Sequence, residues 1–327
     1  MRVLVVKTSS MGDVVHAMPA ATDMLRAFPG LQIDWLVESP FAAVAQMHPG
    51  IRRVLPMAWR KWRRRLFDRS TWDAIASLRT ELRREPYDLV LDLQGLTKSA
   101  LWARQARGPV AGYDHASGRD PLASWFYQRK ARVSLELHAV ERCRRLAAAH
   151  LGYALPQSAP DFGLRPPAPG WMPRGSYAVI IPNASRAEKL WPERRWAAVG
   201  QRLRSKGWLP VVLWGSEAEQ TLAERIAASC EGDVPPFLKV GEAAAVLAGA
   251  QHVVGLDTGL THIAAALGRP TLGIYCDHEP GLAGLTGGRA APVDSIGGKG
   301  QVPGQSEVMA LLERQLSAAA AAATAAR

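Results

Sequence analysis

The chain has 327 residues, of which 48% are hydrophobic, and a formal net charge of +11. This length exceeds that of one typical domain, so we expect two domains, each with its own core. Three cysteines far apart argue against a disulfide framework or a zinc site. The first apolar run is too short for a signal peptide, and no stretch approaches the ~20 residues of a membrane span, which predicts a cytoplasmic protein.

The positive charge is concentrated in the first half. Residues 1–165 hold 25 Lys and Arg against 15 Asp and Glu, whereas residues 166–327 hold 15 against 14. A basic half of this kind attracts an anionic partner, which could be nucleic acid, a membrane surface or a phosphorylated substrate.

Short apolar runs alternate with helical spacing along both halves. In the first half we expect strands at 3–6, 33–37 and 88–93, and helices at 17–28, 72–84 and 96–107. In the second half we expect strands at 177–181, 208–213, 252–256 and 271–274, and helices at 192–206, 217–229 and 260–267. This alternation predicts an α/β fold with two Rossmann-like, doubly wound parallel-sheet domains that face a central cleft.

The domain boundary lies in a proline-rich stretch at 155–173. We expect a first, basic domain at 1–165, a linker at 166–173 and a second domain at 174–312. A final helix begins at about residue 306 and could pack back on the first domain. The alanine-rich tail at 313–327 either extends this helix or frays.

The loop after the first strand, residues 7–16, is the first candidate site. Gly12 lets the backbone turn tightly, and Asp13 stands at the start of a helix. Position alone does not decide whether Asp13 caps the helix or acts as a catalytic base. The loop has neither the GxGxxG nor the Walker pattern.

Strand-to-helix loops of the second half form the second candidate site. The N-terminus of the helix after Asp257, with Thr258 and Gly259, suits a phosphate or diphosphate. Ser185 and Lys189 could reach a phosphate from another loop. Three further residues could bind a ligand or could have a structural role only. In the structural role, Asp257 is an N-cap, Glu219 is a favourable charge near a helix dipole, and His262 is a packing residue.

The segment Arg60-Lys61-Trp62-Arg63-Arg64-Arg65 packs five cations into six residues. Such a run is typical of a solvated helix face or a nucleic-acid patch, yet no nucleic-acid-binding motif accompanies it. Arginine forks suit phosphates and carboxylates, and adjacent tryptophans suit lipid headgroups. The run therefore fits an anionic glycolipid at least as well as a nucleic acid.

Five motifs carry a resemblance to a known family: KTSSMGDVVH at 7–16, DLQGLTKSA at 92–100, PLASWFYQRK at 121–130, HAVER at 138–142 and DTGLTH at 257–262. With them the chain resembles the heptosyltransferases of the ADP-heptose glycosyltransferase family, glycosyltransferase family 9, up to about residue 285. The first and third motifs are similar to the heptosyltransferase I group. The loop Cys276-Asp277-His278-Glu279 departs from the family pattern.

The resemblance implies a GT-B fold and an inverting transfer of L-glycero-D-manno-heptose from ADP-heptose to the 5-position of the inner Kdo of Kdo2-lipid A. It makes Asp13 the general base and the second domain the donor side. The implied donor residues are Ser185, Lys189, Glu219, Asp257, Thr258, Gly259 and His262. The implied acceptor residues are Ser10, Gly12, Arg60, Lys61, Arg63, Arg64, Lys98, His138 and Arg142.

No DxD motif occurs in the chain, so we expect a metal-independent enzyme without a cofactor. The expected partners are ADP-heptose, Kdo2-lipid A and the inner leaflet of the membrane, with no nucleic acid, and the protein is expected to be a peripheral monomer. Two alternatives stay open: a nucleotide-sugar transferase with another acceptor, and a non-catalytic binder of anionic ligands.

Overall fold

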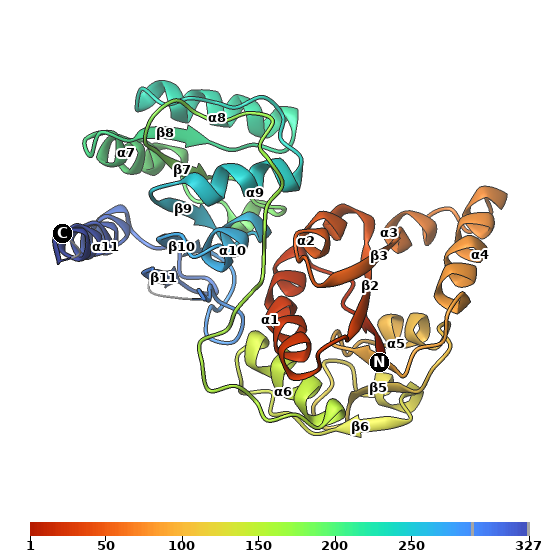
Figure 1. The fold of residues 1–327 in the computed structure, drawn as a ribbon. Helices are drawn as coiled ribbons and strands as arrows, with labels where there is room; N and C mark the ends of the chain where they lie inside the picture. Colours follow the sequence, from red (N-terminus) through yellow and green to blue (C-terminus); the bar gives the residue numbers. More distant parts are fainter. Residues whose placement is uncertain (289–290, 326–327) are drawn as a thin grey trace. The chain divides into compact units, whose positions relative to one another are not determined.

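The computed structural model describes residues 1–288 and 291–325 (Figure 1). The chain divides into two compact units, Met1–Arg165 and Pro166–Arg327. We call them the first unit and the second unit. Each contains its own parallel sheet and its own buried apolar core.

The first unit is built on a six-stranded sheet in the order β3-β2-β1-β4-β5-β6. Its strands are β1 (Arg2–Val6), β2 (Gln32–Glu38), β3 (Ile51–Met57), β4 (Leu89–Asp92), β5 (Val110–Tyr113) and β6 (Arg129–Ala131). Neighbouring strands pair in parallel. The strand order reverses between β1 and β4, and open α/β sheets commonly bind ligands at such a point.

Helices connect the strands of the first unit. They are α1 (Met11–Ala27), α2 (Ala42–Gln46), α3 (Trp59–Trp62), α4 (Arg69–Arg83), α5 (Thr97–Ala103) and α6 (Ala139–Leu151), with 3-10 turns η1 (Ser39–Phe41) and η2 (Pro121–Phe126). α1 begins earlier than predicted, at Met11, because Ser10 caps it. Pro19 therefore lies inside the helix, and Asp13 lies in its first turn.

The second unit has a five-stranded sheet in the order β11-β10-β9-β7-β8, also parallel. Its strands are β7 (Tyr177–Ile181), β8 (Leu209–Val212), β9 (Val253–Leu256), β10 (Thr271–Tyr275) and β11 (Val293–Gly297). Its helices are α7 (Glu193–Arg204), α8 (Glu217–Ser229), α9 (Val240–Gly249), α10 (Gly259–Ala266) and α11 (Gln305–Ala325), with η3 (Ala187–Lys189). Here the order reverses between β7 and β9.

The final helix, α11, packs on the sheet of the second unit, although the sequence also allowed it to pack back on the first domain. Val308, Leu312 and Leu316 of α11 are buried in the second core. Gln315 is also buried, and its Oε1 lies 2.8 Å from His252 Nε2. The predicted boundary at 312 therefore falls inside α11, and the first part of the expected tail belongs to a packed helix.

Within the described residues, no helix combines the length and apolarity needed to span a bilayer. The three cysteines are free and buried.

Candidate active site

The loop after β1 holds Asp13 in the first turn of α1. The backbone N–H of Ser10 donates to Asp13 Oδ2 at 2.7 Å, and the Ser10 hydroxyl lies 3.1 Å from the same oxygen. Asp13 Oδ1 lies 3.4 Å from Arg119 Nη1, and the side chain is 22% exposed. Gly12 lies in the same turn. One carboxylate oxygen thus serves the helix cap while the other lies beside a cation, so capping and proton transfer are compatible in Asp13.

The loop after β4 holds the backbone of this Asp13 loop. Gln94 Oε1 accepts hydrogen bonds from the N–H of Thr8 at 3.0 Å and of Ser9 at 3.2 Å. Lys7 Nζ donates to the carbonyl of Leu93 at 2.9 Å. All three bonds are buried. The segment after β1 is therefore joined to the loop after β4 by three buried bonds, two from its backbone N–H groups and one from the Lys7 side chain.

Asp92, at the end of β4, organises the turn that carries Gln94. Its Oδ1 accepts from the N–H of Gln94 at 2.8 Å, and its Oδ2 accepts from Ser99 Oγ and Tyr127 OH, each at 2.7 Å. Burial raises the pKa of Asp92, and these hydrogen bonds oppose that rise. Gly95 completes the turn with φ +68°, a backbone conformation that favours glycine.

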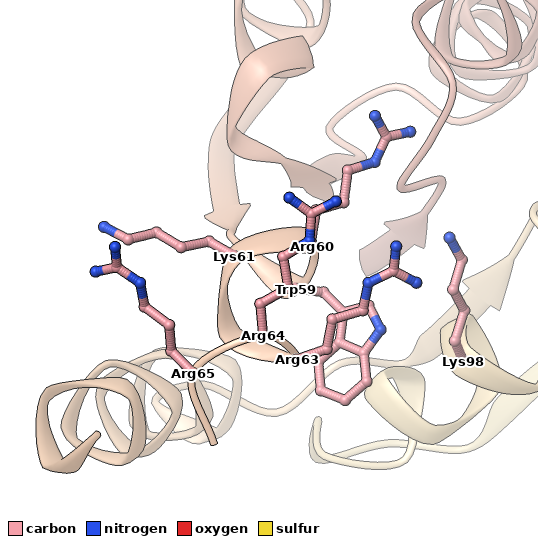
Figure 2. Close-up of a pocket in the computed structure, with 7 residues that line it drawn as sticks. All are labelled: Trp59, Arg60, Lys61, Arg63, Arg64, Arg65 and Lys98. Carbon is pink, nitrogen blue, oxygen red and sulfur yellow. The ribbon is translucent and has the colours of Figure 1, made fainter. Parts of the chain in front are cut away.

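The basic run forms a pocket of the first unit, with a volume of about 670 Å³ (Figure 2). Figure 2 shows the cationic side chains extending from α3 and the turn after it, with Lys98 of α5 on the side of Arg63 and with Lys61 and Arg65 on the opposite side. The pocket is lined by Trp59, Arg60, Lys61, Arg63, Arg64, Arg65 and Lys98. So dense an array of cations suits a ligand with several phosphate or carboxylate groups.

Lys98 connects this cationic pocket to the Asp13 loop. Its Nζ donates to Ser9 Oγ at 3.2 Å. The pKa of Lys98 is lowered, mainly by burial and further by Arg60 and Arg63. The buried carboxylate of Glu38 opposes this shift. The pKa of Glu38 is raised by its burial, and the charges of Arg60 and Lys98 oppose this rise. An anionic ligand in the pocket would relieve the repulsion among these cations.

His138 and Arg142, both predicted on the acceptor side, have structural contacts in the first unit. His138 is the N-cap of α6, where its Nδ1 accepts from the N–H of Val140 at 3.2 Å. Arg142 Nη2 donates to the carbonyl of Ser117 at 2.5 Å, and its guanidinium lies 4.8 Å from the centre of the Tyr113 ring. These contacts stabilise α6, and the two residues stay predictions as acceptor contacts.

The second unit brings Lys189, Asp257 and His262 together. Lys189 Nζ lies 2.5 Å from Asp257 Oδ2, and His262 Nε2 lies 3.4 Å from Asp257 Oδ1. Burial acts to raise the pKa of Asp257, but the hydrogen bonds from His262 and Lys189 outweigh it and lower the pKa to about 2. His278 Nδ1 lies 4.0 Å from Asp257 Oδ2, so the loop that departs from the family pattern contributes a ring here. Asp257 is therefore an ionised carboxylate among basic groups.

The other predicted donor residues lie at helix ends and in loops of this unit. Thr258 is the N-cap of α10, and Gly259 is its first residue. Ser216 is the N-cap of α8, and Glu219 lies in its first turn, where Oε2 accepts from the N–H of Gly215 at 2.8 Å. Ser185 is exposed in the loop after β7. Glu219 thus has its expected structural role as a charge near a helix N-terminus, and its contact with a ribose stays a prediction.

Both clusters lie where the strand order of their sheet reverses. Asp13 follows β1 and Gln94 follows β4 in the first unit. Lys189 follows β7 and Asp257 follows β9 in the second unit. Open α/β sheets bind ligands at this point, outside the carboxyl ends of the strands. Each unit therefore contains a candidate ligand site: a carboxylate beside a cationic pocket in the first unit, and a helix N-terminus beside a lysine in the second.

Comparison with known proteins agrees with this arrangement. The model of glycosyltransferase family 9 (heptosyltransferase) matches residues 75–301. The chain belongs to glycosyltransferase family 9. It is 45% identical to lipopolysaccharide heptosyltransferase 1 of Pseudomonas aeruginosa, over 88% of this chain and 82% of that protein.

Two solved structures of the E. coli heptosyltransferase WaaC are similar to this family 9 chain. The structure with ADP has a TM-score of 0.89, with 38% identity over 96% of this chain and 100% of that one. The structure with ADP-2-deoxy-2-fluoro heptose has a TM-score of 0.84 at the same identity, over 96% and 98%. The predicted GT-B type of fold and the predicted class of enzyme, a glycosyltransferase, are confirmed.

Sequence reasoning missed the residues that support the site of this family 9 enzyme. Asp92 and Gln94 lay inside a quoted motif without an assigned role, and Arg119 was not singled out. The sequence does predict a turn at Gln94-Gly95 after the strand at 88–93, but it does not show that the side chains of this turn hold the first loop. The partners of these side chains become visible only in the folded unit.

Proposed function

We propose that this family 9 glycosyltransferase transfers L-glycero-D-manno-heptose from ADP-heptose to the 5-position of the inner Kdo of Kdo2-lipid A, with inversion, in lipopolysaccharide inner-core synthesis. The observation that carries the proposal is its match, along nearly the whole chain, to a heptosyltransferase holding ADP-2-deoxy-2-fluoro heptose. The anionic acceptor is supported by the cationic pocket beside the Asp13 loop.

In this reaction Asp13 takes the proton of the acceptor hydroxyl. The hydroxyl oxygen forms a bond to the anomeric carbon of the heptose while the bond from that carbon to the phosphate oxygen breaks. The electron pair leaves with ADP, and attack on the face opposite the leaving group inverts the configuration. The bond from the Ser10 N–H fixes the Asp13 carboxylate, so that its other oxygen can receive the proton.

The groups of the second unit stabilise the departing ADP. Lys189 and the N-terminus of α10, with Thr258 and Gly259, can balance the negative charge that develops on the diphosphate. Asp257 holds Lys189 in place before the donor binds. Ser185, Glu219 and His262 remain proposed donor contacts, to diphosphate, ribose and sugar.

The pocket residues of the first unit would bind the phosphates and carboxylates of Kdo2-lipid A, together with Ser10 and Lys98. Because this acceptor is a lipid, we also propose that the protein acts as a peripheral protein on the inner leaflet. The dense cations favour an anionic surface over a neutral one.

The test is an ADP-release assay with ADP-heptose and Kdo2-lipid A. We expect release only when both substrates are present, and a fall on the order of 10² to 10⁴ in rate for Asp13→Asn. Asp73→Asn, an exposed carboxylate on α4, is the matched control and should keep the wild-type rate. Release with a different acceptor alone would support the alternative transferase. Failure with every acceptor, together with DNA binding in moderate salt, would support a binder.

A further inference from the structure

The connection between α3 and α4, together with the first turn of α4, exposes apolar side chains that the first core does not use. The exposed fraction is 42% for Leu66, 104% for Phe67 and 56% for Trp72. Large apolar groups gain free energy when they leave water, so a cluster of them on a surface indicates a contact with another phase or molecule. We call residues 63–72 the tip.

The tip is fixed to the first unit by neighbours that are buried. Trp62 is 7% exposed and lies 5.7 Å from the ring of Trp102 in the first core. Trp72 Nε1 donates to the carbonyl of Leu66 at 2.8 Å, so the exposed indole is tied to the chain beside Phe67. The apolar side chains are therefore presented at a defined place next to α3.

Exposed cations surround these apolar groups. Arg63, Arg64, Arg65 and Arg69 are all exposed within the tip, against the acidic Asp68. An anionic bilayer offers both kinds of contact at once, since its headgroups attract arginine and its acyl boundary accepts aromatic rings. A nucleic acid would match the cations but would leave Phe67 and Leu66 in water.

We propose that the tip docks on an anionic lipid bilayer, with Leu66, Phe67 and Trp72 inserted at the boundary between headgroups and acyl chains. The arginines of the tip contact the headgroups. This inference deepens the proposed function, because it assigns the peripheral contact to named residues. It also places the cationic pocket next to the surface in which a lipid acceptor resides, since Arg63, Arg64 and Arg65 belong to both.

The experiment measures partition of the full chain onto vesicles of phosphatidylethanolamine with about a third phosphatidylglycerol, and onto neutral phosphatidylcholine vesicles. We expect Leu66→Ser/Phe67→Ser to lower partition onto the anionic vesicles on the order of tenfold, given the apolar area of two exposed side chains. Phe237→Ser is the matched control, because Phe237 is 57% exposed in the second unit, and it should partition like the wild type. Equal partition of the double variant and the wild type, or equal binding to neutral vesicles, would overturn the proposal.

A second readout separates this inference from the proposed function. ADP release is measured with Kdo2-lipid A in the vesicles and with a deacylated, water-soluble form of the same acceptor. Docking by the tip predicts that Leu66→Ser/Phe67→Ser loses rate only on the vesicles. An equal loss of rate by the double variant on both acceptors would contradict docking. Absence of ADP release by the wild type with either acceptor would contradict the proposed function, and the partition measurement would still test docking.

Discussion

Substitution of Gln94 tests whether the loop after β4 positions Asp13. Gln94→Met keeps the length of the side chain and removes the acceptor that serves the N–H groups of Thr8 and Ser9. These three residues are at most 6% exposed, so water cannot replace the lost acceptor without a movement of the loop. Each buried N–H left without a partner costs about 1–3 kcal/mol, which gives about 2–6 kcal/mol for a loop that does not move.

The loop can shift to recover part of this energy, and the shift displaces Asp13. We therefore expect the free energy of unfolding to fall by about 2 kcal/mol or more. Because a displacement of about 1 Å at a catalytic group costs on the order of a hundredfold in rate, kcat should fall about tenfold to a hundredfold. KM for ADP-heptose should stay within about twofold, because the proposed donor contacts lie in the second unit.

Chemical denaturation and steady-state ADP release measure the two effects separately. Gln94→Glu keeps an acceptor oxygen and should recover most of kcat. Gln128→Met is the matched control, because Gln128 Oε1 accepts from the N–H of Val110 at 2.8 Å, away from the Asp13 loop. A loss of stability in Gln94→Met at an unchanged kcat, or an equal loss of kcat in Gln128→Met, would show that Gln94 does not position Asp13.

Three further variants test the charged groups. Lys189→Met should lower kcat/KM for ADP-heptose on the order of a hundredfold in ADP release; an unchanged value would remove Lys189 from the donor site. The pKa of Asp257 is lowered from the ordinary value of 3.8 to about 2, so its stabilisation, on the order of 2 kcal/mol, is present above about pH 4 and is lost as the pH falls through 2. The difference in Tm between wild type and Asp257→Asn should therefore narrow on acidification, and a constant difference would contradict the ion pair. Arg60→Gln/Arg63→Gln should raise KM for the acceptor severalfold; a raised donor KM alone would contradict the assignment of the first unit.

Most inner strands of both sheets could be predicted from sequence, whereas the inner strand β5 and several edge strands could not. β1, β4, β7 and β9 are buried, and each shows as a short apolar run. β3 lies at the edge of its sheet and contains Arg52, Arg53 and Pro56, so it has no such run. β6 and β11 are also edge strands with few apolar residues, and they escaped prediction for the same reason.

The charged residues of the candidate site could be predicted from their place in strand-to-helix loops, but the residues that hold these side chains and loops in place could not. Asp13, Lys189 and Asp257 each follow a strand, and that position is visible in the sequence. The bond from Thr8 to Gln94 joins residues 86 positions apart, and the pair from Lys189 to Asp257 joins residues 68 apart. Such partners are set by the order of strands in the sheet, and no local pattern encodes them.

The cations shared by the pocket and the tip affect how acceptor kinetics are measured. Arg63, Arg64 and Arg65 would contact the membrane surface as well as the acceptor. Added salt or a change in lipid charge then alters two quantities at the same time: the number of enzyme molecules at the membrane surface, and the fraction of them whose pocket holds the acceptor. The meaningful acceptor concentration is its mole fraction within the bilayer, and a KM expressed per volume of solution would vary with the amount of vesicle even though the chemistry at Asp13 stays the same.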